Sequence, residues 1–466
     1  MQDDRDLLDE QELEAWDLEP PPPQARAGLA LPLTIVLAGV ILLVVLAVLD
    51  ARALKSQEWG GALLYDEPLP IEEDENILPV MMRRLPEPRS PLIESLEQMP
   101  DGQEVIEQLQ LDKGEWVVLL PVSDETLAGL LESGRIPSRG RFEAVAGALA
   151  RGDSFELAGH EFEVVGRLER GVGGLGFTFV VPDDEAYRPL FEEDGAQQGW
   201  LDLMGRERLA GLPREHVEEW PEPVGPMTRA GKGVPLGVIL GLVLVALGGS
   251  FTYYRILLRL SARRGGYIQP LLDEVRARPG LFWGVHVLMY GAFFLMMVLA
   301  ASYPLVTMRM EHYLSRELTE GSLRHVGAAY ASGDILYAAI VTFGHNYFVA
   351  TLLQTFALSL VIPFGGVIKN LLTFLVVGFA MAPIWAGSAA GMSFHSITMA
   401  VELGAYIVAS FAVAVYWIRI GQGISRGEFG NYLKQGLRVL GGAVLVSGAM
   451  LAIAALYEAA TLILLA

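Results

Sequence analysis

Several ionisable side chains lie inside apolar segments of the second half of this 466-residue sequence, namely His286, His345, Glu402 and Glu458. An ionisable group in the hydrocarbon of a bilayer costs on the order of a few kcal/mol, so these groups should face a bundle interior or an interface. Two roles are open to them. They can form hydrogen bonds between helices, worth about 0.6 kcal/mol each, or line a polar cavity for a proton, an ion or a lipid headgroup.

The spacing of these residues predicts which ones meet. His395 and Glu402 are seven positions apart, so they share one face if a single helix includes both. Their expected partners are His345 and Asn346 on an earlier apolar segment. We therefore select His345, Asn346, His395 and Glu402 as candidate intramembrane polar residues. With two carboxylates and no basic residue well within the spans, hydrogen bonding between helices is favoured over a transport path.

Catalytic and metal-binding motifs are missing from the sequence. It contains no cysteine, which excludes disulfides, thiolate zinc sites and cysteine nucleophiles. It also lacks His-Glu-x-x-His, Gly-x-Ser-x-Gly and Gly-x₄-Gly-Lys-Ser/Thr, so an intramembrane hydrolase is disfavoured and any nucleotide hydrolysis must come from a partner. His160 and His216 show no metal-ligand spacing. We expect a protein that is not an enzyme and has no cofactor.

Seven segments are long and apolar enough to cross a bilayer, which requires about 20 residues as a helix. They are Leu29–Leu49, Val234–Leu258, Leu281–Pro304, Ile335–Ile362, Gly366–Gly387, Ile397–Ile418 and Leu437–Leu465. Glycines on the second segment (Gly237, Gly241, Gly248, Gly249) and on the last (Gly441, Gly442, Gly448) allow close helix approach, either to a partner or within the chain. The fold class is therefore a polytopic α-helical membrane protein with about seven transmembrane helices.

The net charge of −21 is unevenly distributed along the chain. Residues 1–50 carry −8, residues 51–232 carry −18 and residues 233–466 carry +5. No basic face is available for phosphates, which excludes nucleic acid as a partner. The positive-inside rule places the loops after the second and sixth segments in the cytoplasm. The N-terminus is then cytoplasmic and residues 51–232 lie outside the inner membrane.

These boundaries define six regions: an acidic leader expected to be disordered (1–28), helix 1 (29–50), an extracytoplasmic α+β domain (51–232), helix 2 (233–258), a basic cytoplasmic loop (259–280) and a five-helix module (281–466). The second helix end and this loop carry six arginines, Arg255, Arg259, Arg263, Arg264, Arg276 and Arg278. A cluster of that size is expected to contact anionic lipid or a cytoplasmic partner.

The exported region contains β-type runs bounded by Gly, Pro or Asp, at Trp116–Pro121, Ser154–Leu157, Glu161–Leu168 and Phe177–Val181. The second and third runs predict a hairpin with its turn at Gly159-His160. A short helix is expected at Pro91–Leu109, and another is expected to start at Asp183-Asp184-Glu185. Together these elements predict a small α+β domain.

The five-helix region resembles the stage II sporulation protein M family. The likeness rests on four features. They are the basic segment Arg263–Arg278 before the first of the five helices, the motif Phe343-Gly-His-Asn346, Asn370 in the next helix, and His395 followed by Glu402-Leu403 at the start of a helix rich in small residues. The family typically places its His and Glu four residues apart, whereas seven separate them here. The resemblance implies a polytopic fold without a catalytic motif, acting as an anchor or scaffold that localises or regulates cell-wall-acting partners. Partners would then be membrane lipids and other membrane or envelope proteins.

The exported region resembles the extracytoplasmic core domain of macrolide-export-type and lipoprotein-releasing ABC permeases. The matching features are Gly134 to Gly140, the hairpin from Gly152 to Gly166, and Phe179-Val-Val-Pro182 leading into a helix. This second resemblance implies an alternative function, a permease-like subunit of an export or mechanotransmission complex. Its basic loop 259–280 would couple to a separate ATPase. The expected function thus has two versions, a non-enzymatic membrane scaffold or this permease-like subunit.

Overall fold

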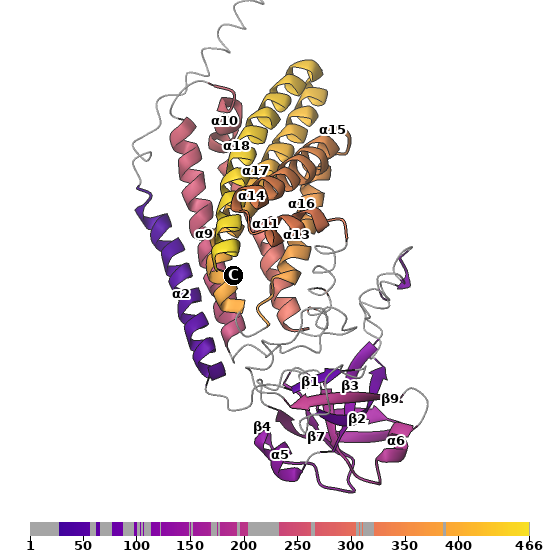
Figure 1. Cartoon of the computed structure of the whole chain (residues 1–466). Helices are drawn as coiled ribbons and strands as arrows, with labels where there is room; N and C mark the ends of the chain where they lie inside the picture. The colour runs from indigo at the N-terminus through magenta and orange to yellow at the C-terminus, as the bar shows by residue number, and fades with distance from the viewer. Residues whose placement is uncertain are drawn as a thin grey trace, which may run out of the picture.

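The computed structural model describes two folded parts, a helical module and a sheet domain. It describes residues 28–55, 62–65, 77–86, 113–203 with short gaps, 233–261, 266–303, 321–384 and 388–465, with a few isolated positions between them. The acidic leader lies outside the described residues except for Gly28, as does most of the helix expected at Pro91–Leu109. Figure 1 shows the helices and the sheet along the chain.

In the described part of the chain, six helical segments are long and apolar enough to cross a membrane, so the chain is a multi-pass helical membrane protein. They comprise α2 (Ala30–Lys55), α9 (Val234–Ser261), α11 (Pro279–Ala301), the continuous run of α14 (Ile335–Gly344), η3 (His345–Ala357) and α15 (Leu358–Val361), α17 (Ser388–Arg426) and α18 (Phe429–Leu465). Two short helices, α10 (Gln269–Ala277) and α13 (Arg324–Ala331), lie in the connections.

The remaining segment expected to span, 366–387, forms the shorter helix α16 (Gly365–Ala380) of 16 residues. Prolines limit it on both sides. Pro363 precedes Phe364, whose φ of 55° places it in the left-handed region just before the helix. Beyond Ala380 the chain is no longer helical through Pro383 and Ile384. Proline cannot donate a backbone hydrogen bond and restricts the residue before it, which accounts for the short helix.

The helices α17 and α18 form a long antiparallel pair at the centre of the module (Figure 1). Gly427, with a φ of 72°, reverses the chain between them. Close approach is possible because glycines face aromatic rings across the pair: a Cβ on Gly436 would lie 2.8 Å from the ring of Tyr416. The apolar runs 397–418 and 437–465 of the sequence therefore correspond to parts of longer helices.

A second tight pair consists of α2 and α9, which come before and after the sheet domain in the sequence. A Cβ on Gly241 would lie 2.8 Å from Leu43, and one on Gly248 would lie 2.7 Å from the backbone nitrogen of Val36. Gly249 faces Ala400 of α17 in the same way, at 3.1 Å. The glycines of the second segment thus pack within the chain.

The sheet domain has a nine-stranded mixed sheet. Its strands are β1 (Ala62–Tyr65), β2 (Ile77–Pro86), β3 (Lys113–Leu120), β4 (Leu131–Gly134), β5 (Glu143–Ala146), β6 (Ser154–Leu157), β7 (His160–Leu168), β8 (Thr178–Pro182) and β9 (Ala196–Leu203). The order is β1-β9-β2-β3-β8-β5-β7-β4, with β6 paired to β7. The β3–β8 and β5–β7 pairs are parallel and the others are antiparallel.

Both faces of the central strands are covered, which explains why the run from Val117 to Leu120 is apolar without alternation. Val118 and Leu120 pack with α5 (Asp124–Gly129) on one face, and Val117 and Leu119 pack with residues of the β6–β7 hairpin and α6 (Arg188–Glu192) on the other. The sequence-predicted strands are confirmed to within a few residues. The hairpin turn, however, is formed by Ala158 and Gly159, both with positive φ, and His160 begins β7.

Candidate functional site

A cavity of about 920 Å³ lies within the helical module. Its walls come from α13, α14, η3, α16, α17 and α18, together with a few residues of the connections. Its lining is largely apolar, but titratable and amide side chains also contribute: Tyr330, His345, Asn346, Gln354, Lys369, His395, Glu402, Tyr406 and Glu458. The cavity thus brings together all four of the intramembrane polar residues singled out from the sequence.

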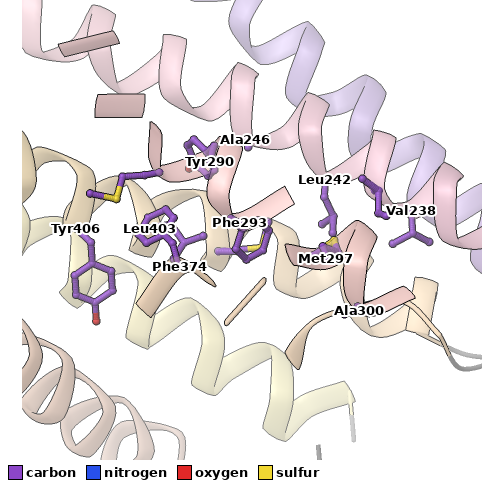
Figure 2. Close-up of a cluster of buried hydrophobic side chains, with 14 of the residues drawn as sticks. Val238, Leu242, Ala246, Tyr290, Phe293, Met297, Ala300, Phe374, Leu403 and Tyr406 are labelled. Atoms are coloured by element: carbon purple, nitrogen blue, oxygen red, sulfur yellow. The ribbon is translucent and has the colours of Figure 1, made fainter. Parts of the chain in front are cut away.

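An apolar core formed by α9, α11, α16 and α17 lies beside the cavity. Figure 2 shows Phe293, Met297 and Phe374 in this core, and the hydroxyl end of Tyr406 pointing away from it. Tyr406 belongs to both regions, because its ring packs with the core and its side chain also lines the cavity. Tyr406 therefore lies at the boundary between the apolar core and the cavity.

The Glu402 carboxyl group receives two hydrogen bonds from neutral donors. Asn346 Nδ2 donates to Glu402 Oε1 over 3.0 Å, and Tyr406 Oη donates to the same oxygen over 3.4 Å. The first of these contacts confirms the expected meeting of Asn346 with Glu402. Both bonds are made to Oε1, so the carboxyl group retains capacity to accept further hydrogen bonds through Oε2.

His395 lies on the same helix as Glu402 and lines the same cavity, as its spacing predicts. Its contact differs from the expectation, because His395 Nδ1 lies 4.0 Å from Oε1 of Glu458 on α18. His345 instead lies near the short helix α13, with its ring centroid 5.7 Å from that of His325. The seven-residue spacing thus places His395 and Glu402 on one wall, each facing a different helix.

Lys369 lines the cavity from within an apolar segment, which corrects the expectation that no basic residue lies well within the spans. It lies on α16, and its Nζ donates to the carbonyl oxygen of Ala350 over 3.3 Å and to Asn370 Oδ1 over 3.4 Å. The ammonium also lies 5.6 Å from the ring centroid of Tyr406. A lysine four residues inside an apolar helix was the available signal, since such groups are functional candidates by default.

The segment η3 that carries His345 and Asn346 is a π-helix of 13 residues. Most π-helical segments are single-turn bulges, and they occur frequently at functional sites. Two threonines follow the wider hydrogen-bond pattern: Thr351 Oγ1 donates to Asn346 O, and Thr355 Oγ1 donates to Ala350 O, each over 2.8 Å to a residue five positions earlier. Ala350 O also accepts from Lys369, so the π-helix provides backbone acceptors to the cavity wall.

Other intramembrane polar residues are satisfied within the bundle. Buried Asn370 donates through Nδ2 to Ser410 Oγ over 2.9 Å and accepts from Thr355 Oγ1 over 3.1 Å, which joins α16, α17 and η3. His286 is buried, with Nδ1 2.7 Å from Phe282 O and Nε2 in hydrogen-bond contact with Tyr253 Oη. His286 thus takes the hydrogen-bonding role, one of the two that the sequence leaves open for it, and Asn370 also joins neighbouring helices.

The arginine cluster proposed for lipid or partner contact is partly engaged in packing. Arg278 Nε donates to Glu274 over 2.7 Å, and Arg419 of α17 binds the other oxygen of the same carboxylate. Arg255 donates to Gly28 O. Arg259 is exposed and Arg276 is half-buried, whereas Arg263 and Arg264 lie outside the described residues. The Glu274–Arg419 contact confirms that the two basic loops lie at one end of the bundle.

Within the described part of the chain, no group of three or more His, Asp or Glu side chains is arranged to hold a metal ion. Comparisons with protein-family models, with curated proteins and with solved structures found no match to this chain. The class that the fold defines is a multi-pass helical membrane protein with a small mixed-sheet domain between its first two long helices.

Proposed function

We propose that the protein is a non-enzymatic membrane scaffold of the cell envelope, which holds its sheet domain outside the cytoplasmic membrane to localise or regulate partners there. The observation that carries this proposal is the close packing of the two helices that flank the sheet domain in the sequence. Its two flanking helices, α2 and α9, contact one another backbone to backbone, as at Gly248 and Val36. A pair packed this closely resists sliding of one helix along the other, so the chain segments that lead to the sheet domain start from fixed points in the helical module.

The α2–α9 pair also packs against the rest of the helical module. Gly249 of α9 faces Ala400, and Gly404 of α17 faces the ring of Tyr253 at 2.9 Å. The buried His286–Tyr253 contact links α11 to the same place. Contacts of this kind suit a protein whose parts keep one arrangement while it binds others.

The stage II sporulation protein M resemblance supports the scaffold, because that family implies anchoring of cell-wall-acting proteins. The strongly acidic exported region favours cationic, neutral or metal-bridged partners over polyanionic ones, since like charges repel across an aqueous gap. Anionic lipids around the basic end of the bundle are the other expected contact, through exposed Arg259 and its neighbours.

A second candidate is the permease-like subunit with a separate ATPase, and helix α10 favours it. This short helix lies at the basic end between α9 and α11, and Glu274 ties it to Arg419 of α17. Next to it, Tyr267 is 89% exposed. A firmly attached helix with an exposed aromatic residue is the element through which an ATPase would transmit motion to the bundle.

Photocrosslinking from two positions in intact cells separates these candidates. A photoreactive amino acid replaces Phe142 on the sheet domain in one strain and Tyr267 beside α10 in another. The scaffold predicts a crosslink from position 142 to an envelope protein, unchanged when cellular ATP is depleted. A near-stoichiometric crosslink from position 267 to an ATPase would overturn the scaffold and establish the permease-like subunit. The photoreactive amino acid placed at position 156 instead of Glu156, an exposed position on the neighbouring hairpin, is the matched control for position 142.

A further inference from the structure

The cavity holds Lys369 and Glu402 without pairing one with the other. Lys369 is held by two neutral oxygens, those of Ala350 and Asn370. None of the ion pairs among the described residues includes it. Glu402 is likewise held by neutral donors on Asn346 and Tyr406. A structural ion pair in a low-dielectric interior requires its members to be in contact, and these are not.

The side chain of Tyr406 accounts for the separation. Its ring centroid lies 5.6 Å from the Lys369 ammonium, and its hydroxyl group donates to Glu402 Oε1. The lysine therefore lies against the ring and the carboxyl group lies at the hydroxyl end. Glu458 adds a second carboxyl group to the cavity, 4.0 Å from His395. The chamber thus has a basic region and an acidic region with a tyrosine between them.

We propose that this cavity binds a zwitterion with a primary amine, whose ammonium group contacts Glu402 and Glu458 and whose acidic group contacts Lys369. The ammonium group of such a ligand would pair with the carboxyl groups of the acidic region, and its acidic group would pair with the lysine of the basic region. Binding would replace water or an unpaired charge by charge-assisted hydrogen bonds, which are about twice as strong as neutral ones.

The size and walls of the cavity suit a ligand with an apolar part. A volume of about 920 Å³ lies within the range of sites that hold drug-sized molecules, which is about 300 to 1,000 Å³. Apolar side chains such as Val377 and Met399 form much of the wall, and the exposed residues Gln354 and Leu462 lie at its rim. The same ligand chemistry occurs in the headgroup of phosphatidylethanolamine and in free amino acids, so the test must include both sources.

The test uses the full-length protein in a non-ionic detergent and measures binding by titration calorimetry. Four compounds are compared: short-chain phosphatidylethanolamine, the analogous phosphatidylglycerol, phosphoethanolamine and leucine. We expect at least one compound with a primary amine to bind, and phosphatidylglycerol to bind at least tenfold more weakly. Binding of phosphatidylethanolamine alone assigns a lipid, and binding of leucine alone assigns a free amino acid. Equal binding of phosphatidylglycerol, or no binding of any amine, overturns the proposal.

Two variants test the two regions. Glu402→Gln keeps an oxygen that accepts from Asn346 and Tyr406, and Lys369→Met keeps the side-chain length, so each removes charge with little change of shape. We expect each to weaken binding at least tenfold. Glu428→Gln and Lys434→Met, exposed positions at the basic end of the bundle, are the matched controls and should bind as the natural sequence does. Unchanged binding in both cavity variants would contradict the proposal.

The ligand can also be varied, which keeps the test valid if a variant fails to fold. N-acetylation of the amine removes the ammonium group and leaves the rest of the ligand intact. The acetylated form of whichever compound binds should lose at least tenfold in affinity to the natural protein. Retained affinity would show that the acidic region does not recognise the ammonium group, and the proposal would be wrong.

Discussion

The sheet domain and the cavity of the helical module treat buried charge in opposite ways. In the sheet domain, the buried Glu143 carboxylate accepts from Arg135 over 2.6 and 2.7 Å and from the backbone nitrogen of Ser138 over 2.8 Å. In the cavity, Glu402 and Lys369 have neutral partners and remain apart. Fully matched groups hold a fold together, whereas unmatched groups retain the capacity to bind. The comparison separates the cavity, where the proposed ligand would bind, from residues such as Glu143 and Glu274, whose ion pairs stabilise the fold.

Gly248→Leu should have the largest effect, because it acts on the helix pair that joins the two regions. A side chain there would meet the Val36 nitrogen at 2.7 Å and the Pro32 oxygen at 2.8 Å, and backbone atoms cannot move aside as side chains do. We expect a loss of about 3 kcal/mol or more from overpacking. The measurements are membrane accumulation and the thermal unfolding midpoint in detergent. Gly284→Leu, where a Cβ meets open space, should show little change.

Glu143→Gln tests the matched side of the comparison. The loss of hydrogen bonds to a charged group should destabilise the sheet domain by about 2 kcal/mol. Bonds from Arg135 and Ser138 lower the pKa of Glu143 from 4.5 to about 2. A lowered folded-state pKa stabilises the fold above pH 4.5, and that contribution is lost as the pH falls from 4.5 toward about 2.

Hydrogen exchange of the sheet strands in the full-length protein, measured from pH 6 to pH 3, checks both parts of this expectation. The natural sequence should lose protection across the lower part of this range, and Glu143→Gln should lose less because its side chain does not titrate. Glu156→Gln, on the exposed face of β6, is the control. The same pH profile for both variants would show that Glu143 does not carry the acid sensitivity.

Asn370→Ala and Glu402→Gln give the smallest expected effects and sharpen the contrast inside the module. Asn370→Ala removes the bonds to Ser410 and Thr355 together with longer contacts of 3.4 Å to Lys369 and the Tyr406 carbonyl. At about 0.6 kcal/mol for each of the two shorter bonds, the loss should be at least about 1 kcal/mol. Glu402→Gln keeps its two donors and should change stability by less than about 0.5 kcal/mol. Thermal unfolding in detergent without added ligand measures both. A larger loss for Glu402→Gln would make that carboxyl group structural and reverse the comparison.

The sequence predicts the long helices well because long apolar runs specify them, but it predicts only β3, β6, β7 and β8 of the nine described strands. The helix expected to start at Asp183 begins at Arg188. The limits of α17 were harder to predict. Its apolar stretch marks the part expected to lie in hydrocarbon, whereas the helix extends from Ser388 to Arg426 through residues of mixed polarity. The hairpin turn shifted by one residue because Ala158 takes a positive φ, which its residue type does not indicate.

The cavity could be predicted only in part. Spacing placed His395 and Glu402 on one face, and the meeting of Asn346 with Glu402 followed from their apolar surroundings. The sequence could not show that Tyr330, from the connection between the third and fourth apolar segments, lines the same cavity. Nor could it show the π-helix, since a change from four to five residues between hydrogen-bond partners leaves no pattern in residue type.

The length of α16 has a consequence for the surrounding lipid. Sixteen residues at 1.5 Å each rise about 24 Å, whereas the hydrocarbon core of a bilayer is about 30 Å thick. A hydrophobic mismatch of this size is relieved by local thinning of the bilayer or by shielding from neighbouring helices. Thinning brings the lipid headgroups closer to Lys369 than they would be beside a helix of full length. Shielding instead places neighbouring helices close to this lysine. The membrane around this protein is therefore expected to be thinnest on the side of α16.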